Sequence, residues 1–236
     1  IVQEVFMKRT IIAVISIVLI AFAFTACRQS VVIPFDPMPG PNTPSEPSVP
    51  DYTIQVGDKT YQHLDEAIAA APENGTINIG AGRFVIPSTL SFKNLTINGA
   101  GMDETIIEVN GSWGFNVTGS STTISNLTIA DASGTASRLL NVQASQILID
   151  HVRLEGKYNS NSSGATNSGI LADSNVTDIT VKNSEFKGIR MPLNIDLENA
   201  ENPKVTISEN VFDTFLKLAF TTNIDLLDIS SDNTFN

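Results

Sequence analysis

The chain has 236 residues, 42% of them hydrophobic, which is enough for one sizeable core without a second domain. Its 25 acidic and 14 basic residues give a net charge of −11, which argues against nucleic acid as a partner because the phosphate backbone would be repelled. The single cysteine, Cys27, excludes an intrachain disulfide.

Residues 7–27 have the pattern of an export signal. The basic residues of MKR, at 7–9, precede the apolar stretch IIAVISIVLIAFAF, and small residues then lead into Cys27. This order resembles a bacterial lipoprotein signal, which implies that Cys27 is lipidated and anchors the chain to the membrane of a bacterial cell envelope. We therefore predict a signal peptide over 1–26 with the true start at Met7. An uncleaved membrane anchor is the alternative.

The segment after Cys27 is rich in proline. Seven of the eighteen residues in IPFDPMPGPNTPSEPSVP, at 33–50, are proline. Prolines at this density favour an extended chain and prevent a packed core. We therefore predict that 27–50 is a tether and that 51–236 forms the folded domain.

The segment TYQHLDEAIAAAPENG predicts one short helix at the start of this domain. Four apolar residues recur at helical spacing: Leu64, Ala67, Ile68 and Ala71. Thr60 is the expected N-cap, and Pro72 marks the expected end of the helix. A single amphipathic helix before a β-rich region is expected to cap one end of the core.

One pattern then recurs through the rest of the chain. Its clearest copies are TTISNLTI (122–129), ILIDHVRL (147–154), ITVKNSEF (179–186) and VTISENVF (205–212), with looser copies in LTING (95–99) and LDISSDNTF (227–235). A second short strand precedes most copies: FNVT (115–118), LNVQ (140–143), ILAD (170–173), LNID (193–196) and LAFT (218–221). The central residues of the copies are Ile97, Ile124, Ile149, Val181, Ile207 and Ile229. A repeat of this length with several short strands predicts a parallel β-solenoid of about six coils.

These repeats and the segment HLDEAIAAAPENGTINIGAGRF resemble the right-handed parallel β-helix proteins of the pectin lyase-like superfamily. The resemblance covers 51–236 and implies an all-β, right-handed parallel β-helix with a short N-terminal capping helix. Lyases, hydrolases, esterases and non-catalytic adhesins share these motifs, so the resemblance indicates the fold rather than one activity.

Asp150 and His151 form an adjacent acid–base pair that invites a catalytic interpretation. In a parallel solenoid, however, equivalent residues of successive coils stack about 4.8 Å apart. The alignment then pairs opposite charges: Asp150 with Lys182, Arg153 with Glu185, and Glu155 with Lys187, with Asp213 one coil further on. His151 shares its position with the polar corner residues Asn126, Asn183 and Glu209. We therefore interpret the pair as a structural corner.

The second strand of each repeat carries the better candidate residues. Alternation predicts an inward-facing set: Phe115, Val117, Leu140, Val142, Ile170, Leu193, Ile195, Leu218 and Phe220. Two outward rows are predicted beside it, one of Thr118, Gln143, Asp173, Asp196 and Thr221, the other of Asn116, Asn141, Leu171, Asn194 and Ala219. Asp173 and Asp196 would stack without a lysine in their row. Two such carboxylates can share a proton or bind Ca²⁺.

The resemblance implies that this strand face is where β-helix polysaccharide enzymes place their catalytic acids. In an enzyme, Asp173 and Asp196 would be those acids, and Arg190 would contact a sugar carboxylate. The amide side chains expected to bind substrate hydroxyls are Asn116, Asn141, Gln143 and Asn194. Trp113 and Tyr158 each stand alone in the sequence, which favours a packing role.

We predict a surface lipoprotein that binds a polysaccharide or a cell-surface glycan, or acts as an adhesin, without catalysis and without a required cofactor. The first alternative is a polysaccharide lyase or hydrolase that uses the Asp pair. The second is a scaffold that only displays loops such as KYNSNSSGATNSG, at 157–169. Because the chain stops just after an apolar strand, we also expect either C-terminal truncation or end-to-end self-association.

Overall fold

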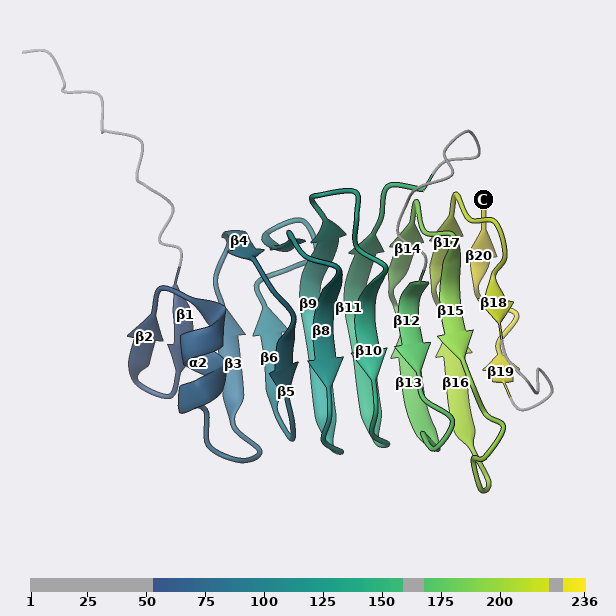
Figure 1. The fold of residues 1–236 in the computed structure, drawn as a ribbon, viewed down its shortest axis with the longest axis horizontal. Coiled ribbons are helices and arrows are strands. Elements are labelled where there is room, and N and C mark those ends of the chain that lie inside the picture. The colour runs from purple at the N-terminus through teal and green to yellow at the C-terminus, as the bar shows by residue number, and fades with distance from the viewer. Residues whose placement is uncertain (1–52, 159–167, 221–226) are drawn as a thin grey trace, which may run out of the picture. The chain divides into compact units, whose positions relative to one another are not determined.

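The computed structural model describes residues 53–158, 168–220 and 227–236, which form a parallel β-solenoid of about six turns (Figure 1). Strands make up 52% of this all-β structure and helix 4%. The predicted signal peptide, Cys27 and the tether lie outside the described residues, as do Thr221 and most of the loop at 157–169.

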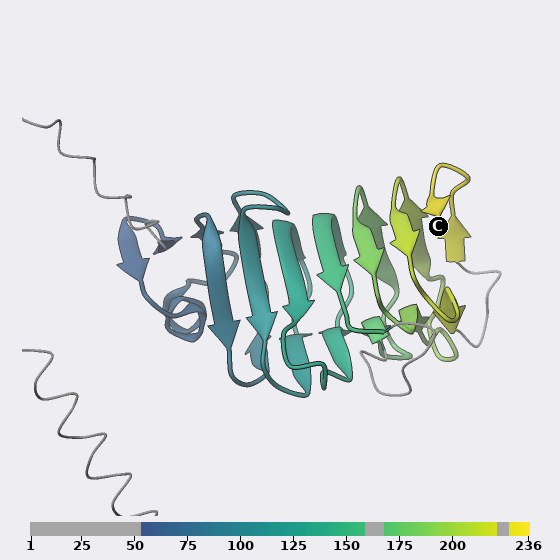
Figure 2. The ribbon, with the colours of Figure 1, turned by 90° about the horizontal axis from the view of Figure 1, so that it is seen from above.

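Two sheets run along the solenoid (Figures 1 and 2). The main path of the fourteen-stranded sheet is β19 (Leu227–Ile229), β16 (Lys204–Ser208), β13 (Asp178–Lys182), β11 (Ile147–Glu155), β9 (Thr122–Asp131), β6 (Thr96–Gly99), β3 (Thr76–Ile79), β1 (Ile54–Val56) and β2 (Lys59–Tyr61). Its branches are β4 (Gly82–Ile86), β7 (Thr105–Val109), β14 (Glu185–Lys187), β17 (Val211–Asp213) and β20 (Thr234–Phe235). The second sheet has the order β18 (Ala219–Phe220), β15 (Met191–Ile195), β12 (Ser168–Ala172), β10 (Arg138–Val142), β8 (Trp113–Val117) and β5 (Leu90–Phe92).

The stacking predicted from the repeats is confirmed. All six central residues pair in one row across successive coils: Ile97, Ile124, Ile149, Val181, Ile207 and Ile229. Ile77 of β3 adds one further rung that the repeat alignment did not include. The row is apolar because it faces the interior, where its members from Ile77 to Ile207 are buried and Ile229 of the last coil is partly buried.

The inward-facing set of the second sheet is confirmed except in its last coil. The members from Phe115 to Ile195 are buried, but Leu193 pairs with Ala219 and not with Leu218 as predicted. The backbone N–H groups of Leu216 and Lys217 both donate to the Arg190 carbonyl. Leu216 and Lys217 therefore both lie opposite Arg190, as in a β-bulge. The register predicted for β18 is wrong by one residue.

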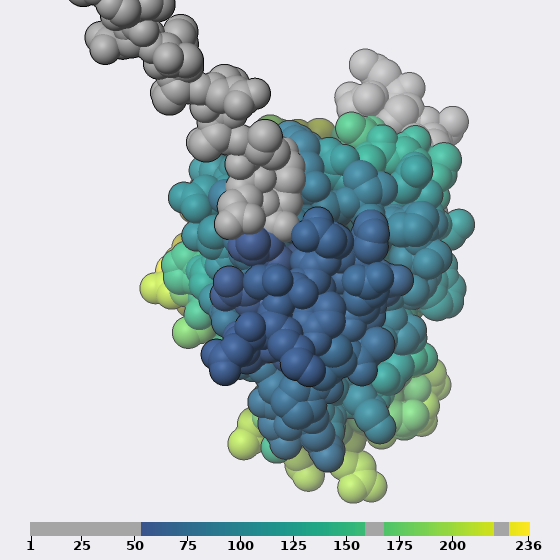
Figure 3. Space-filling model, turned by 90° about the vertical axis from the view of Figure 1, so that its left-hand side faces the viewer, coloured from purple at the N-terminus to yellow at the C-terminus, as the bar shows by residue number. Residues whose placement is uncertain are grey.

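The predicted capping helix is confirmed as α2 (Leu64–Ala70), which buries Leu64 and Ala67 (Figure 3, viewed toward this end). It begins later than expected. Thr60 pairs with Gln55 in the antiparallel contact between β2 and β1, so the N-cap is His63 rather than Thr60. The helix ends before Pro72, as predicted.

The polar corners share a left-handed backbone conformation. Asn126, His151, Asn183 and Glu209 have φ of 57°, 54°, 51° and 56°. This left-handed conformation lets the chain turn between two strands of one coil.

An interior polar ladder follows these corners, which sequence reasoning missed. Asn210 donates through Nδ2 to the Val181 carbonyl and to Asn233 Oδ1, each at 3.0 Å. Its Oδ1 accepts the backbone N–H of Ser184 at 3.0 Å. The neighbouring row is aromatic: buried Phe212 is stacked between buried Phe186 and Phe235, which is exposed in the last coil.

Candidate functional site

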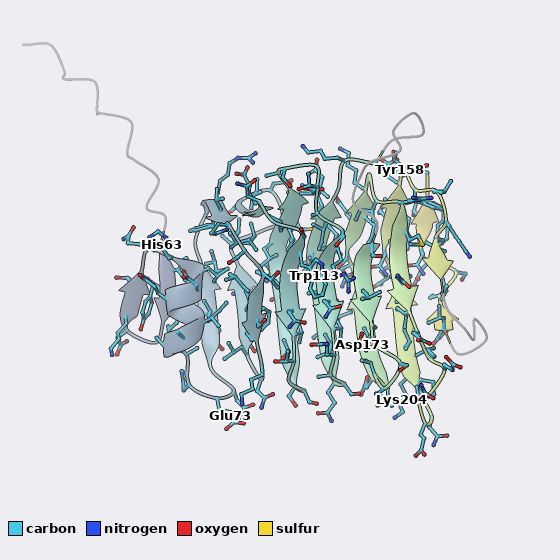
Figure 4. The ribbon with its side chains drawn as sticks, viewed as in Figure 1. His63, Glu73, Trp113, Tyr158, Asp173 and Lys204 are labelled. Carbon is cyan, nitrogen blue, oxygen red and sulfur yellow. The ribbon has the colours of Figure 1, made fainter. Side chains whose placement is uncertain are left out.

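Asp173 and Asp196 lie in adjacent coils at the ends of β12 and β15 (Figure 4 labels Asp173). The residues before them, Ala172 and Ile195, pair with each other and face the core. The next residue in each strand therefore points outward, and both carboxylates are half-buried. The backbone N–H of Asp196 donates to the Ala172 carbonyl at 3.1 Å, which fixes the two positions side by side.

An open cavity of about 370 Å³ lies at this row. It is lined by Leu171, Ala172, Asp173, Ser174, Asn175, Asn194 and Asp196. Gln143, from the end of β10, donates through Nε2 to Asp173 Oδ2 at 3.1 Å. Asp196 Oδ1 accepts the backbone N–H of Glu198 at 3.0 Å. Among the described residues this lining contains no basic side chain, so its polar side chains are carboxylate, amide and hydroxyl groups.

The amides of the neighbouring row are partly occupied by one another. Asn141 donates through Nδ2 to Asn116 Oδ1 at 2.8 Å, and Asn116 donates to Ser91 Oγ at 3.2 Å. Asn194 donates to Ser168 Oγ at 3.3 Å. The structure therefore brings Gln143 and Asn194 to the two carboxylates, whereas Asn116 and Asn141 belong to a ladder in earlier coils.

Arg190 is not brought to the carboxylates. It precedes β15 and Asp196 follows it, so the two residues lie at opposite ends of the strand, roughly 20 Å apart at about 3.3 Å per residue. Within 53–158, 168–220 and 227–236, no group of three or more His, Cys, Asp or Glu side chains is arranged to hold a metal ion. A Ca²⁺ ion at Asp173 and Asp196 would depend on amide, carbonyl or water oxygens as further ligands and stays a prediction.

Asp150 and His151 have the geometry of a corner. His151 Nδ1 lies 2.7 Å from Asp150 Oδ1, which also accepts Asn183 Nδ2 at 2.9 Å. Lys182 Nζ lies 3.5 Å from Asp150 Oδ2, in the predicted charge pair. Burial acts to raise the pKa of Asp150, but the Asn183 hydrogen bond and the contacts with His151 and Lys182 outweigh it and hold the pKa below its ordinary value. The Asp150 carboxylate therefore finds its hydrogen-bond and charge partners within the corner itself.

The structure also pairs two residues that sequence reasoning did not connect. The guanidinium of Arg138 lies over the ring of Trp113, with Cζ 4.1 Å from the ring centroid. Trp113 is 36% exposed on the outer face of the second sheet. The repeat spacing aligns the two residues, because each stands two positions before an inward residue, Phe115 or Leu140, but it does not predict that their side chains meet on the outside.

Comparison of the chain with protein-family models, with curated proteins and with solved structures found no match. The described residues define a parallel β-solenoid with an acidic and amide-lined cavity on one sheet. None of its helices within those residues is long and apolar enough to cross a membrane.

Proposed function

We propose that the chain is an exported lipoprotein whose β-solenoid binds a polysaccharide or cell-surface glycan without catalysis. We further propose that the solenoid is a right-handed β-helix of the pectin lyase-like superfamily, anchored to the bacterial cell envelope through Cys27. The lipoprotein-like signal and the strand–Asn–strand repeats support these assignments. The observation that carries the binding function is the open cavity at which Asp173, Asp196 and Asn194 converge.

The chemistry of this cavity suits a hydroxyl-rich ligand. Ionised carboxylates accept hydrogen bonds from hydroxyl groups, and an amide both donates and accepts. Because equivalent residues repeat about every 4.8 Å along the solenoid, a ligand lying across the coils meets similar groups at each step. A linear glycan offers such a repeating row of hydroxyl groups, which is why we favour it over a small compact ligand.

The contacts of the carboxylates favour binding over catalysis. Gln143 engages Asp173 and a backbone N–H engages Asp196, while the one arginine expected to assist lies at the other end of the strand. General acid–base chemistry needs a carboxyl group tuned by its neighbours and placed against the reacting bond.

One observation favours a glycoside hydrolase as the second candidate. Asp173 and Asp196 follow paired residues of adjacent coils, which stack about 4.8 Å apart, so their carboxyl groups can reach the roughly 5 Å separation that retaining enzymes use.

The test is retention on a panel of polysaccharides, with and without Ca²⁺, using the full chain in a neutral detergent. The variant is Asp173→Asn with Asp196→Asn, and the control is Asp58→Asn with Asp228→Asn, which removes the same charge from exposed positions outside the cavity. Since hydrogen bonds to a charged group contribute about 1.5–3 kcal/mol each, we expect at least about tenfold weaker binding for the cavity variant and no change for the control.

The same assay separates the alternatives. Reducing or unsaturated sugar ends released by the wild type, and lost with Asp173→Asn alone, would make the protein an enzyme. Neither retention nor products would contradict glycan binding and favour a display scaffold. Equal weakening by both double variants would show that total charge, and not this cavity, controls binding.

A further inference from the structure

Arg138 differs from the other arginines of the sheets in the partners that hold it. Arg83 pairs with Glu108, and Arg153 pairs with Glu185 and Asp103. Among the residues that the structure describes, Arg138 has no carboxylate partner: it lies over Trp113 and donates through Nη1 to Asn141 Oδ1 at 3.2 Å. A positive charge held by neutral groups is notable in a chain with a net charge of −11.

Arg138 is also held in place. The aromatic ring covers one face of its guanidinium, and Asn141 is fixed in turn by its hydrogen bond to Asn116. A guanidinium has five N–H donors, and the described contacts use one of them. Fixing the side chain before binding lowers the entropy cost when the remaining donors meet an acceptor.

The surroundings leave the charge of Arg138 available to a ligand. Trp113 and Ser168 are its register partners in the two adjacent coils, and residues 159–167, which lead into Ser168, contain no acidic residue in the sequence. The Asp131 carboxylate, in the loop before β10, accepts the backbone N–H groups of Gly134 and Ala136.

The acidic row lies too far away to cancel this charge. Gln143 and Asp173 stand about five residues further along the strand direction, roughly 17 Å from the level of Arg138 (Figure 4 labels Trp113 and Asp173). This is about twice the Debye length of about 8 Å at physiological ionic strength.

We propose that Arg138, supported by Trp113 and Asn141, binds an oxyanion that the glycan carries as an isolated acidic substituent, either a carboxylate or a sulfate ester. This inference rests on the glycan binding proposed above. The planar guanidinium matches a carboxylate or sulfate in a bidentate geometry. A densely charged polyanion would bring further negative charges against Asp173, Asp196 and the net charge of the chain. A largely neutral glycan with sparse acidic groups avoids this repulsion.

Matched polymers test the charge preference with the full chain in neutral detergent. Gellan is compared with carboxyl-reduced gellan for the carboxylate, and sparsely sulfated agar with agarose for the sulfate. We expect the wild type to bind at least one acidic polymer roughly tenfold more tightly than its neutral counterpart, and Arg138→Gln to remove that difference. Lys204→Gln, which removes an exposed charge at the start of β16 in the other sheet, is the control and should keep it.

Trp113 supplies an independent readout because it is the only tryptophan of the chain. Glucuronate and glucose 6-sulfate, titrated separately, should change its fluorescence in the wild type and in Lys204→Gln but not in Arg138→Gln. Glucose should leave the emission of all three proteins unchanged. A response that persists in Arg138→Gln would place the anion elsewhere and overturn the inference.

The outcomes also separate this inference from the proposed function. Equal binding of acidic and neutral polymers, with binding still lost in the Asp173→Asn, Asp196→Asn variant, would refute the role of Arg138 and leave glycan binding intact. Retention of no polymer by the wild type would refute both. Loss of the charge preference in Arg138→Gln, with residual binding to neutral polymers, would support both.

Discussion

Replacing Asn210 with alanine tests whether the interior polar ladder stabilises the solenoid. The Asn210 side chain is fully buried and serves both the Val181 carbonyl and the Ser184 N–H. Alanine would leave these two buried backbone groups without a partner, and each costs about 1–3 kcal/mol. We therefore expect a loss of about 2–6 kcal/mol in local stability, centred on β13 and β16. The control is Asn98→Ala, because Asn98 is partly exposed and its partners Asn78, Ser125 and Asn126 are exposed or partly exposed, so that water can replace the lost bonds.

Amide hydrogen exchange of the full chain is the appropriate assay, because coils of a solenoid open with local rather than global free energies. In Asn210→Ala, amides of 179–186 and 204–212 should exchange at least about twentyfold faster, since 1.4 kcal/mol corresponds to tenfold. Amides of 76–99, in the first coils, should be unaffected. Equal, small effects of Asn210→Ala and Asn98→Ala would refute the reasoning and show that the interior ladder contributes no more than a solvated one.

Two further predictions concern the corner and the close stacking of coils. Burial acts to raise the pKa of Asp150, but the Asn183 hydrogen bond and nearby charges hold it below its unfolded value of 3.8. The ionised Asp150 should therefore stabilise the fold above pH 3.8, and this stabilisation should disappear as the pH falls through the lower folded pKa. Melting temperatures should therefore show Asp150→Asn destabilising at neutral pH and converging with the wild type in acid; a gap independent of pH would contradict this. Gly99→Ala should lower the free energy of unfolding by about 1–3 kcal/mol, because a Cβ there would lie 2.1 Å from the Asn126 carbonyl oxygen. Urea titration should find Gly101→Ala, whose Cβ would meet only a flexible side chain at 3.6 Å, close to the wild type.

The sequence predicted which side chains of the candidate site stack in one row, but it did not predict the hydrogen bonds that they make. Alternation and repeat spacing placed Asp173 beside Asp196, and the strand register agrees. The hydrogen bond from Gln143 and the separation from Arg190 depend on where each strand ends, which the repeat pattern does not define. The pairing of Trp113 with its arginine required the register of two coils and the rotamers of both side chains.

The amino-acid sequence by itself determined which residues stack, except in the last coil of the second sheet. Apolar residues such as Ile124, Ile149 and Val181 are buried together only if equivalent positions of successive repeats stack on one another. The repeat pattern therefore specified the strand register. The same logic specified the charge pairs, including Arg153 with Glu185.

Tertiary structure decided the features that depend on competition between neighbouring segments. Thr60 has the chemistry of an N-cap, but its backbone pairs with β1, so the helix begins later. Ala219 takes the place expected for Leu218, because two N–H groups of the preceding loop share the Arg190 carbonyl. Asn210 is polar yet faces the core, because its neighbours in adjacent coils satisfy every group that its side chain presents. In each case the deciding hydrogen bonds join residues of different strands or coils, which local propensity does not describe.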